Sequence, residues 1–121
     1  MEKITIKSHL ISEDEIKFTG KGIMKDNEII FYEDKVKTKI KILENMITIT
    51  REENYCLKME FIRGKKTEAT YNMYGKNFYL EIFTNDIKIG KNKIFINYDL
   101  TLDKNEKMNF IYNLEYSIDS E

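Results

Sequence analysis

Several residue types are rare or missing in this chain of 121 residues, and each absence narrows what the chain can be. It contains no tryptophan, no proline, one cysteine (Cys56) and one histidine (His9). One cysteine excludes an internal disulfide, and one histidine excludes a zinc site built on clustered histidines. No stretch approaches the roughly 20 consecutive apolar residues that a membrane-spanning helix needs. The absence of proline suits long, uninterrupted strands.

Charge and the first residues bear on partners and compartment. Twenty basic residues oppose 21 acidic ones, which leaves a formal net charge of −1. A nearly neutral chain has no bulk field to attract nucleic acid or an anionic membrane. The segment Met1–Lys7 alternates polar and apolar residues, whereas a signal peptide has a continuous apolar run. We therefore expect a cytoplasmic protein that does not associate with membranes, folded as one domain over residues 1–121.

Alternation of apolar and polar residues dominates the sequence and is clearest between Phe61 and Thr84. It continues on both sides of Gly64 and again on both sides of Gly75. A side-chain period of two residues is that of a β-strand, and glycine supplies the positive φ of tight turns. This stretch therefore predicts three antiparallel strands joined by two hairpins.

The same period extends over the whole chain. Lysines alternate strictly with Val36, Thr38, Ile40 and Ile42 through 36–42, and two further alternating runs fill 94–102 and 108–118. Two in-phase glycines, Gly20 and Gly22, predict a bulge or a sharply coiled strand, and Thr84–Asp86 predicts a bend before Ile87. No helical period of useful length appears. The sequence therefore predicts an all-β fold, a single antiparallel meander of about ten strands that closes into a barrel of 8–10 strands.

Several of these segments resemble one protein family. The spacing of Phe61, Gly64, Thr67, Tyr71, Gly75 and Leu80 resembles that of the YwiB-like family of small uncharacterised bacterial proteins. The segments 19–22, 29–33 and 36–42 resemble that family's second hairpin and the strand after it, and 93–118 resembles its terminal hairpin. The resemblance implies a calycin-like β-barrel, similar to lipocalins or fatty-acid-binding proteins. It implies no activity, and the missing tryptophan means that the Gly-x-Trp signature of true lipocalins is absent.

The motifs that could carry catalysis all have simpler interpretations. Gly20-Lys21-Gly22 precedes no helix, so it lacks the helix start that a phosphate loop requires. No serine or cysteine beside His9 suggests an activated nucleophile, and the strand around Cys56 favours a packed thiol. The acidic runs 13–15 and 52–53 lack the spacing of a calcium loop. We expect a protein that is not an enzyme and that uses no metal or cofactor.

The apolar face of the predicted strands supplies the candidate site. Large aromatic residues share this face with isoleucine, leucine and methionine, and a buried tyrosine hydroxyl needs a hydrogen-bond partner. We expect the barrel interior to bind a small, mostly apolar molecule, an inference that also draws on fold analogy. The expected lining residues are Thr67, Tyr71, Phe78, Tyr98 and Tyr112.

Two alternatives remain open. Apolar residues in the exterior phase suggest a protein-interaction module or a homodimer acting through the outside of the barrel. These residues are Ile62, Tyr79, Phe83, Phe95 and Ile111. The lysines at 35, 37, 39 and 41 form a basic stripe, but the aromatic residues do not alternate with it, so nucleic-acid binding is less favoured.

Overall fold

The computed structural model of the protein describes residues 1–103 and 106–119, which form an antiparallel β-barrel without a helix. Ten strands follow one another along the chain: β1 (Glu2–Ile11), β2 (Glu15–Lys25), β3 (Glu28–Glu33), β4 (Val36–Ile42), β5 (Ile47–Glu52), β6 (Tyr55–Phe61), β7 (Lys66–Met73), β8 (Lys76–Gly90), β9 (Lys93–Asp103) and β10 (Glu106–Ile118). Each strand pairs with its neighbour in sequence, and β10 pairs with β1 to close the barrel. The predicted closed meander is confirmed. The sequence predicts a turn between the alternating runs 94–102 and 108–118, and residues 104 and 105 of that stretch lie outside the described residues.

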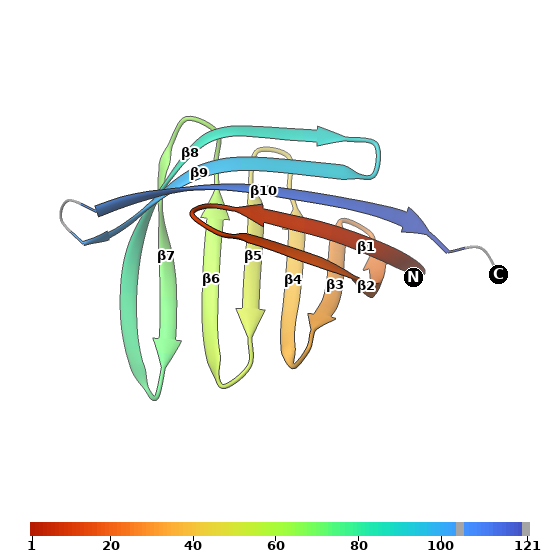
Figure 1. The fold of residues 1–121 in the computed structure, drawn as a ribbon, viewed down its shortest axis with the longest axis horizontal. Helices are drawn as coiled ribbons and strands as arrows, with labels where there is room; N and C mark the ends of the chain where they lie inside the picture. Colours follow the sequence, from red (N-terminus) through yellow and green to blue (C-terminus); the bar gives the residue numbers. More distant parts are fainter. Residues whose placement is uncertain (104–105, 120–121) are drawn as a thin grey trace.

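The barrel is flattened into two layers whose strands cross at a steep angle (Figure 1). We call the layer of β3 to β7 with the first half of β8 the long layer. The crossing layer contains β1, β2, β9, β10 and the second half of β8. Strand β8 belongs to both layers because the ladder shifts register between Thr84 and Asp86, where Asn85 is the extra residue. The predicted bend at this point is therefore a β-bulge inside one continuous strand.

The segment between β6 and β7 is fixed to this bulge. The amide of Gly64 donates a hydrogen bond to the carbonyl of Thr84 at 2.7 Å, and the amide of Thr84 donates to the carbonyl of Lys65 at 3.2 Å. Arg63 forms a parallel bridge with Thr84 and an ion pair with Asp86 at 3.2 Å. Gly64 has a φ of +73°, which glycine adopts without strain. The second predicted turn is a tight hairpin, with Tyr74 at φ +53° and Gly75 at +75°.

A bulge and a sharply coiled strand were the two structures predicted at Gly20 and Gly22, and this part of β2 lies at a corner of the barrel beside β3. The pairing of β1 with β2 is continuous through both glycines, so β2 carries no bulge against β1 there. A Cβ on Gly22 would lie 2.7 Å from the carbonyl oxygen of Ile30. Glycine is therefore needed at position 22 because the backbone of β3 approaches closely.

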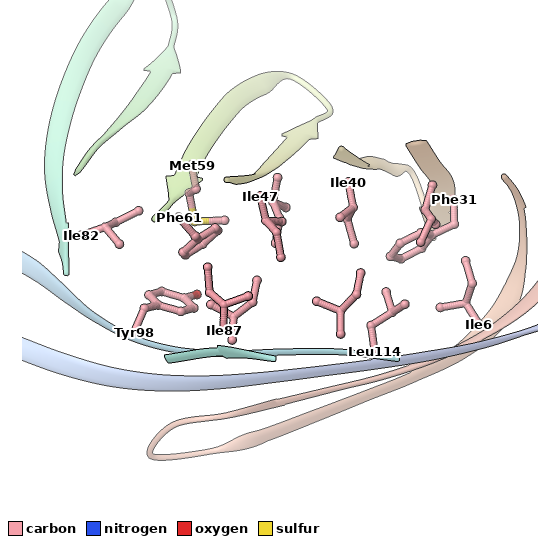
Figure 2. Packing of buried hydrophobic residues seen from close by; sticks show 14 of the residues in the cluster. Ile6, Phe31, Ile40, Ile47, Met59, Phe61, Ile82, Ile87, Tyr98 and Leu114 are labelled. Carbon is pink, nitrogen blue, oxygen red and sulfur yellow. The ribbon is translucent and has the colours of Figure 1, made fainter. Parts of the chain in front are cut away.

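The core fills the space between the two layers, as Figure 2 shows, with Ile40, Ile47 and Phe61 on one side and Ile6 and Leu114 on the other. These five side chains are almost completely buried. Burial of each such side chain contributes roughly 1.5–3 kcal/mol to stability. The isoleucines suit both strand geometry and dense packing. No helix in the described part of the chain is long and apolar enough to cross a membrane.

Candidate functional site

One end of the long layer is less well covered than the rest of the interior. The hairpins β3–β4, β5–β6 and β7–β8 extend beyond β1 and β2 at the bottom of Figure 1. Inward-phase residues of β6, β7 and β8 near these hairpins are partly or largely exposed, although they share a face with the core. We call this the open end. Its exposed inner surface, the inner shelf, consists of Tyr55, Leu57, Tyr71, Phe78 and Leu80.

The inner shelf is built by cross-strand pairing. Leu57 pairs with Tyr71, and Tyr71 pairs with Phe78, so three neighbouring strands place these side chains in one row. The Tyr71 ring stacks on Tyr55 with centroids 5.6 Å apart and lies 6.3 Å from the Phe78 ring. Aromatic pairs contribute about 0.5–1.5 kcal/mol beyond the burial of their area. The row therefore forms a continuous apolar surface, in which Phe78 is 52% exposed.

Polar side chains continue the same row toward β3. Leu57 pairs with Arg51, and Arg51 pairs with Thr38, so both polar residues face the interior beside the inner shelf. The Arg51 Nη2 atom lies 3.8 Å from Glu33 Oε1, and their side chains are 30% and 18% exposed. The Arg51 Nε and Thr38 Oγ1 atoms are buried, and neither has a hydrogen-bond partner among the described residues. Buried polar atoms without partners are uncommon in folded proteins.

Two tyrosines on the crossing layer face this polar group. Burial raises the pKa of Tyr98 to about 12, although the positive charge of Arg51 opposes the rise. Burial also raises the pKa of Tyr112 above its usual range, and the Glu33 carboxylate adds to this effect. Arg51 and a hydrogen bond with Ser8 act in the opposite direction on Tyr112. Both phenols are therefore neutral at physiological pH, and Arg51 and Glu33 are the charges near them.

The five predicted lining residues lie in three places. Tyr71 and Phe78 belong to the inner shelf. Tyr98 is packed in the core between the rings of Phe61 and Phe110, at centroid distances of 4.8 and 5.3 Å, and Tyr112 is packed against the same core. Thr67 lies at the opposite end of β7, where its hydroxyl donates to the carbonyl of Glu60.

Two charged residues at the open end, Arg51 and Glu33, were not among the predicted lining residues. Arg51 follows Ile47 and Ile49 at the two-residue period, and Glu33 follows Ile29 and Phe31 in the same way. Glu33 faces inward beside Arg51. Thr38 shares its face with Ile40. Strict application of the alternation to charged residues could have found Arg51 and Glu33.

The other candidate motifs lie outside this site. His9 is partly exposed, and its Nε2 atom lies 3.1 Å from Glu15 Oε2 on the outside of the barrel. Cys56 is a half-buried free thiol. Among residues 1–103 and 106–119, no group of three histidine, cysteine, aspartate or glutamate side chains is arranged to hold a metal ion.

A cleft of about 540 Å³ lies at the end of the long layer opposite the inner shelf. Its lining includes Met46, Ile62, Arg63, Lys65 and Ile89. The Arg63 guanidinium already donates to the carbonyl of Ile87 and pairs with Asp86. The polar groups of Arg63 therefore hold the fold together, unlike the unpartnered atoms near the inner shelf.

The exterior residues predicted for protein contacts do not share one environment. Tyr79 is exposed, whereas Ile62, Phe83, Phe95 and Ile111 are half-buried. Phe95 lies under the ammonium group of Lys88, 5.4 Å from the ring centroid. In the basic stripe, Lys39 lies 3.7 Å from Glu28. Acidic neighbours thus accompany the lysines on this outer surface.

Comparisons with known proteins identify relatives but no activity. The family described as Domain of unknown function (DUF1934) matches residues 3–115. The crystal structure of the ywiB protein from Bacillus subtilis is similar, with a TM-score of 0.74 and 22% sequence identity over 98% of this chain and 91% of that one. At this identity the similarity shows a shared fold. No curated protein matches the chain.

Proposed function

Because the chain belongs to the DUF1934 family, whose function is unknown, we propose from its own structure that it is a non-enzymatic protein that binds a small, mostly apolar molecule at the open end. The proposal depends mainly on the partial exposure of the inner shelf, because these residues face inward and yet are only partly covered. An uncovered apolar surface inside a barrel gains free energy when a ligand removes it from water. Cytoplasmic location belongs to the same proposal, since Cys56 has no disulfide partner in the chain.

Phe78 and Tyr79 provide a matched test of this proposal. They are neighbours on β8 with opposite phases, and both are more than half exposed. Titration with the apolar fluorophore Nile red should give saturable binding that Phe78→Ala weakens several-fold and Tyr79→Ala leaves unchanged. Native mass spectrometry of protein purified from cells should show a co-purified mass. Absence of both binding and a co-purified mass would reject the proposal.

A second candidate function is supported by the β7–β8 hairpin. Tyr74 at its tip is 83% exposed, and Tyr79 on its outer face is 61% exposed. Exposed tyrosines on one projecting element suit a protein interface or a homodimer. Light scattering should then show a dimer that Tyr79→Ala dissociates. A monomer at all concentrations would exclude the homodimer.

A further inference from the structure

We infer that the open end selects neutral ligands that carry a hydrogen-bond acceptor oxygen, such as the carbonyl of a ketone or amide, and that Arg51 and Thr38 bind this oxygen. The inference rests on the proposed function, because it specifies what kind of apolar molecule the inner shelf accepts. The main observation behind it is that two paired residues of one interior row, Thr38 and Arg51, each have a buried polar atom that forms no hydrogen bond with any residue that the structure describes.

The first step of the argument concerns position. Residues directly opposite each other in an antiparallel pair have Cβ atoms about 4.5–5.5 Å apart. Thr38 and Arg51 stand in this relation, and Arg51 in turn lies opposite Leu57 of the inner shelf. A ligand whose apolar part lies on the shelf can therefore direct a polar group toward Arg51 and Thr38.

The second step concerns hydrogen bonding. An arginine Nε carries a donor and no acceptor, and a threonine hydroxyl can donate as well as accept. A buried donor without a partner has a cost comparable to a lost hydrogen bond. An acceptor oxygen satisfies both atoms, whereas a second donor satisfies only the hydroxyl. The Arg51 side chain is 30% exposed, whereas its Nε atom and the Thr38 hydroxyl are covered, so a ligand oxygen reaches them when the side chains that cover them move aside.

The third step concerns charge. Glu33 lies 3.8 Å from Arg51 and balances its positive charge. The nearby tyrosines Tyr98 and Tyr112 are neutral at physiological pH. A carboxylate ligand would bring a second negative charge beside Glu33 in a poorly solvated place, which is unfavourable. A neutral carbonyl receives the hydrogen bonds without this repulsion.

Three naphthalenes of similar shape test the inference: 2-acetylnaphthalene, 2-ethylnaphthalene and 2-naphthoate. Affinities are measured from ligand fluorescence, and amide shifts in ¹H–¹⁵N spectra locate the site. The ketone should bind about tenfold more tightly than the hydrocarbon, as expected for a hydrogen bond to a charged donor. It should also bind more tightly than the carboxylate, and the shifts should include Thr38, Arg51 and Tyr71.

The variants are chosen so that folding is preserved. The double variant Glu33→Gln, Arg51→Met leaves no unpaired charge, and it should lose most of the preference for the ketone, because only the Thr38 hydroxyl remains to bind the oxygen. Thr38→Val should reduce the preference for the ketone, and Thr84→Val should not. Lys58→Met, which removes an exposed positive charge from the neighbouring strand β6, is the charge control and should keep the full preference. Thermal unfolding of each variant verifies that it is folded.

The outcomes separate the two proposals. If the ketone and the hydrocarbon bind the unmodified protein equally, or if the carboxylate binds as tightly as the ketone, the inference is wrong and the binding function stands. Persistence of the full preference in the double variant also overturns it. A crystal structure in which the ketone binds elsewhere and a water molecule contacts Arg51 and Thr38 would also overturn the inference. If none of the three naphthalenes binds although Nile red does, the inference is wrong and the binding function stands; if Nile red does not bind either and no mass co-purifies, the proposed function itself fails and the inference with it.

Discussion

Thr38 on β4 and Arg51 on β5 are direct cross-strand partners, and both have a buried polar atom that no described residue hydrogen-bonds. The pair lies where the apolar core meets the inner shelf. Its position suggests that the interior is not optimised for stability alone, because a valine at position 38 would fill the same space without an unpartnered hydroxyl. This relationship leads to the first prediction.

Thr38→Val and Thr84→Val should both stabilise the ligand-free protein, each by about 1 kcal/mol. The two threonines are 1% and 0% exposed, and neither hydroxyl has a partner among the described residues. Valine keeps the β-branched shape and removes the desolvated hydroxyl. Urea denaturation measures the change in the free energy of unfolding. Destabilisation of both variants would mean that the hydroxyls are hydrogen-bonded in solution.

Phe61→Ala and Phe78→Ala should differ sharply in stability although both side chains have the inward phase. Phe61 is completely buried, so its truncation should cost about 3–5 kcal/mol through lost burial and a cavity. Phe78 is 52% exposed, and its truncation should cost less than about 1 kcal/mol. Thermal and urea unfolding of the two variants make the comparison. Equal losses would show that the open end is covered in solution.

Gly22→Ala should destabilise the barrel more than Gly20→Ala. A Cβ at position 22 would lie 2.7 Å from the backbone oxygen of Ile30, which cannot move without disturbing β3. At position 20 the nearest atom is the end of the Phe18 ring at 2.5 Å, and a side chain can rotate away. We expect about 1–3 kcal/mol for Gly22→Ala and a smaller loss for Gly20→Ala. Denaturation curves recorded in parallel decide the order.

Stability should fall as the pH rises from 10 toward 12. The pKa of Tyr98 is raised from 10.0 to about 12 by burial, so the folded protein holds this proton more tightly than the unfolded chain. The stabilisation that this raised pKa provides is complete below pH 10. It is lost as the pH rises from 10 to 12, by roughly 1.4 kcal/mol per pH unit. Urea denaturation at several pH values measures the slope.

Tyr98→Phe is the control for this pH dependence. It removes the ionisable hydroxyl and keeps the ring that packs on Phe61 and Phe110. The slope between pH 10 and 12 should become shallower, and the remainder reflects other groups such as Tyr112, whose pKa is also raised by burial. An unchanged slope in the variant would show that Tyr98 does not ionise in this range.

Alternation and short connections were sufficient to predict the strands and their order, and closure was predicted because it removes the exposed edges of a long meander. Alternation works because a period of two assigns each side chain to one face, whatever the long-range structure. It assigned Tyr71 and Tyr98 to the same face, and both do point inward. The period carries no information on whether that face is covered. Tyr98 is buried in the core between the two layers, whereas Phe78 is more than half exposed at the open end.

The polar part of the site was less accessible to prediction. Arg51 and Glu33 come from strands separated by β4, and their approach depends on the curvature of the closed barrel. Charged residues generally lie on the outside of a protein, so the inward phase of Arg51 and Glu33 was not recognised from the sequence. The bulge at Thr84 is similar, because an extra residue in a ladder is defined by the partner strand as much as by its own sequence.

The two corners of the flattened barrel differ in how firmly they are joined. At one corner β8 continues from one layer into the other, so many backbone hydrogen bonds of β8 would have to break before the layers could separate there. At the other corner only four residue pairs, from Gly22–Phe31 to Lys25–Glu28, connect β2 to β3. Amide protons of this short ladder should exchange with solvent earlier than those of β8. Transient opening of the barrel would then begin beside Phe31, and a bulky ligand would enter from that side.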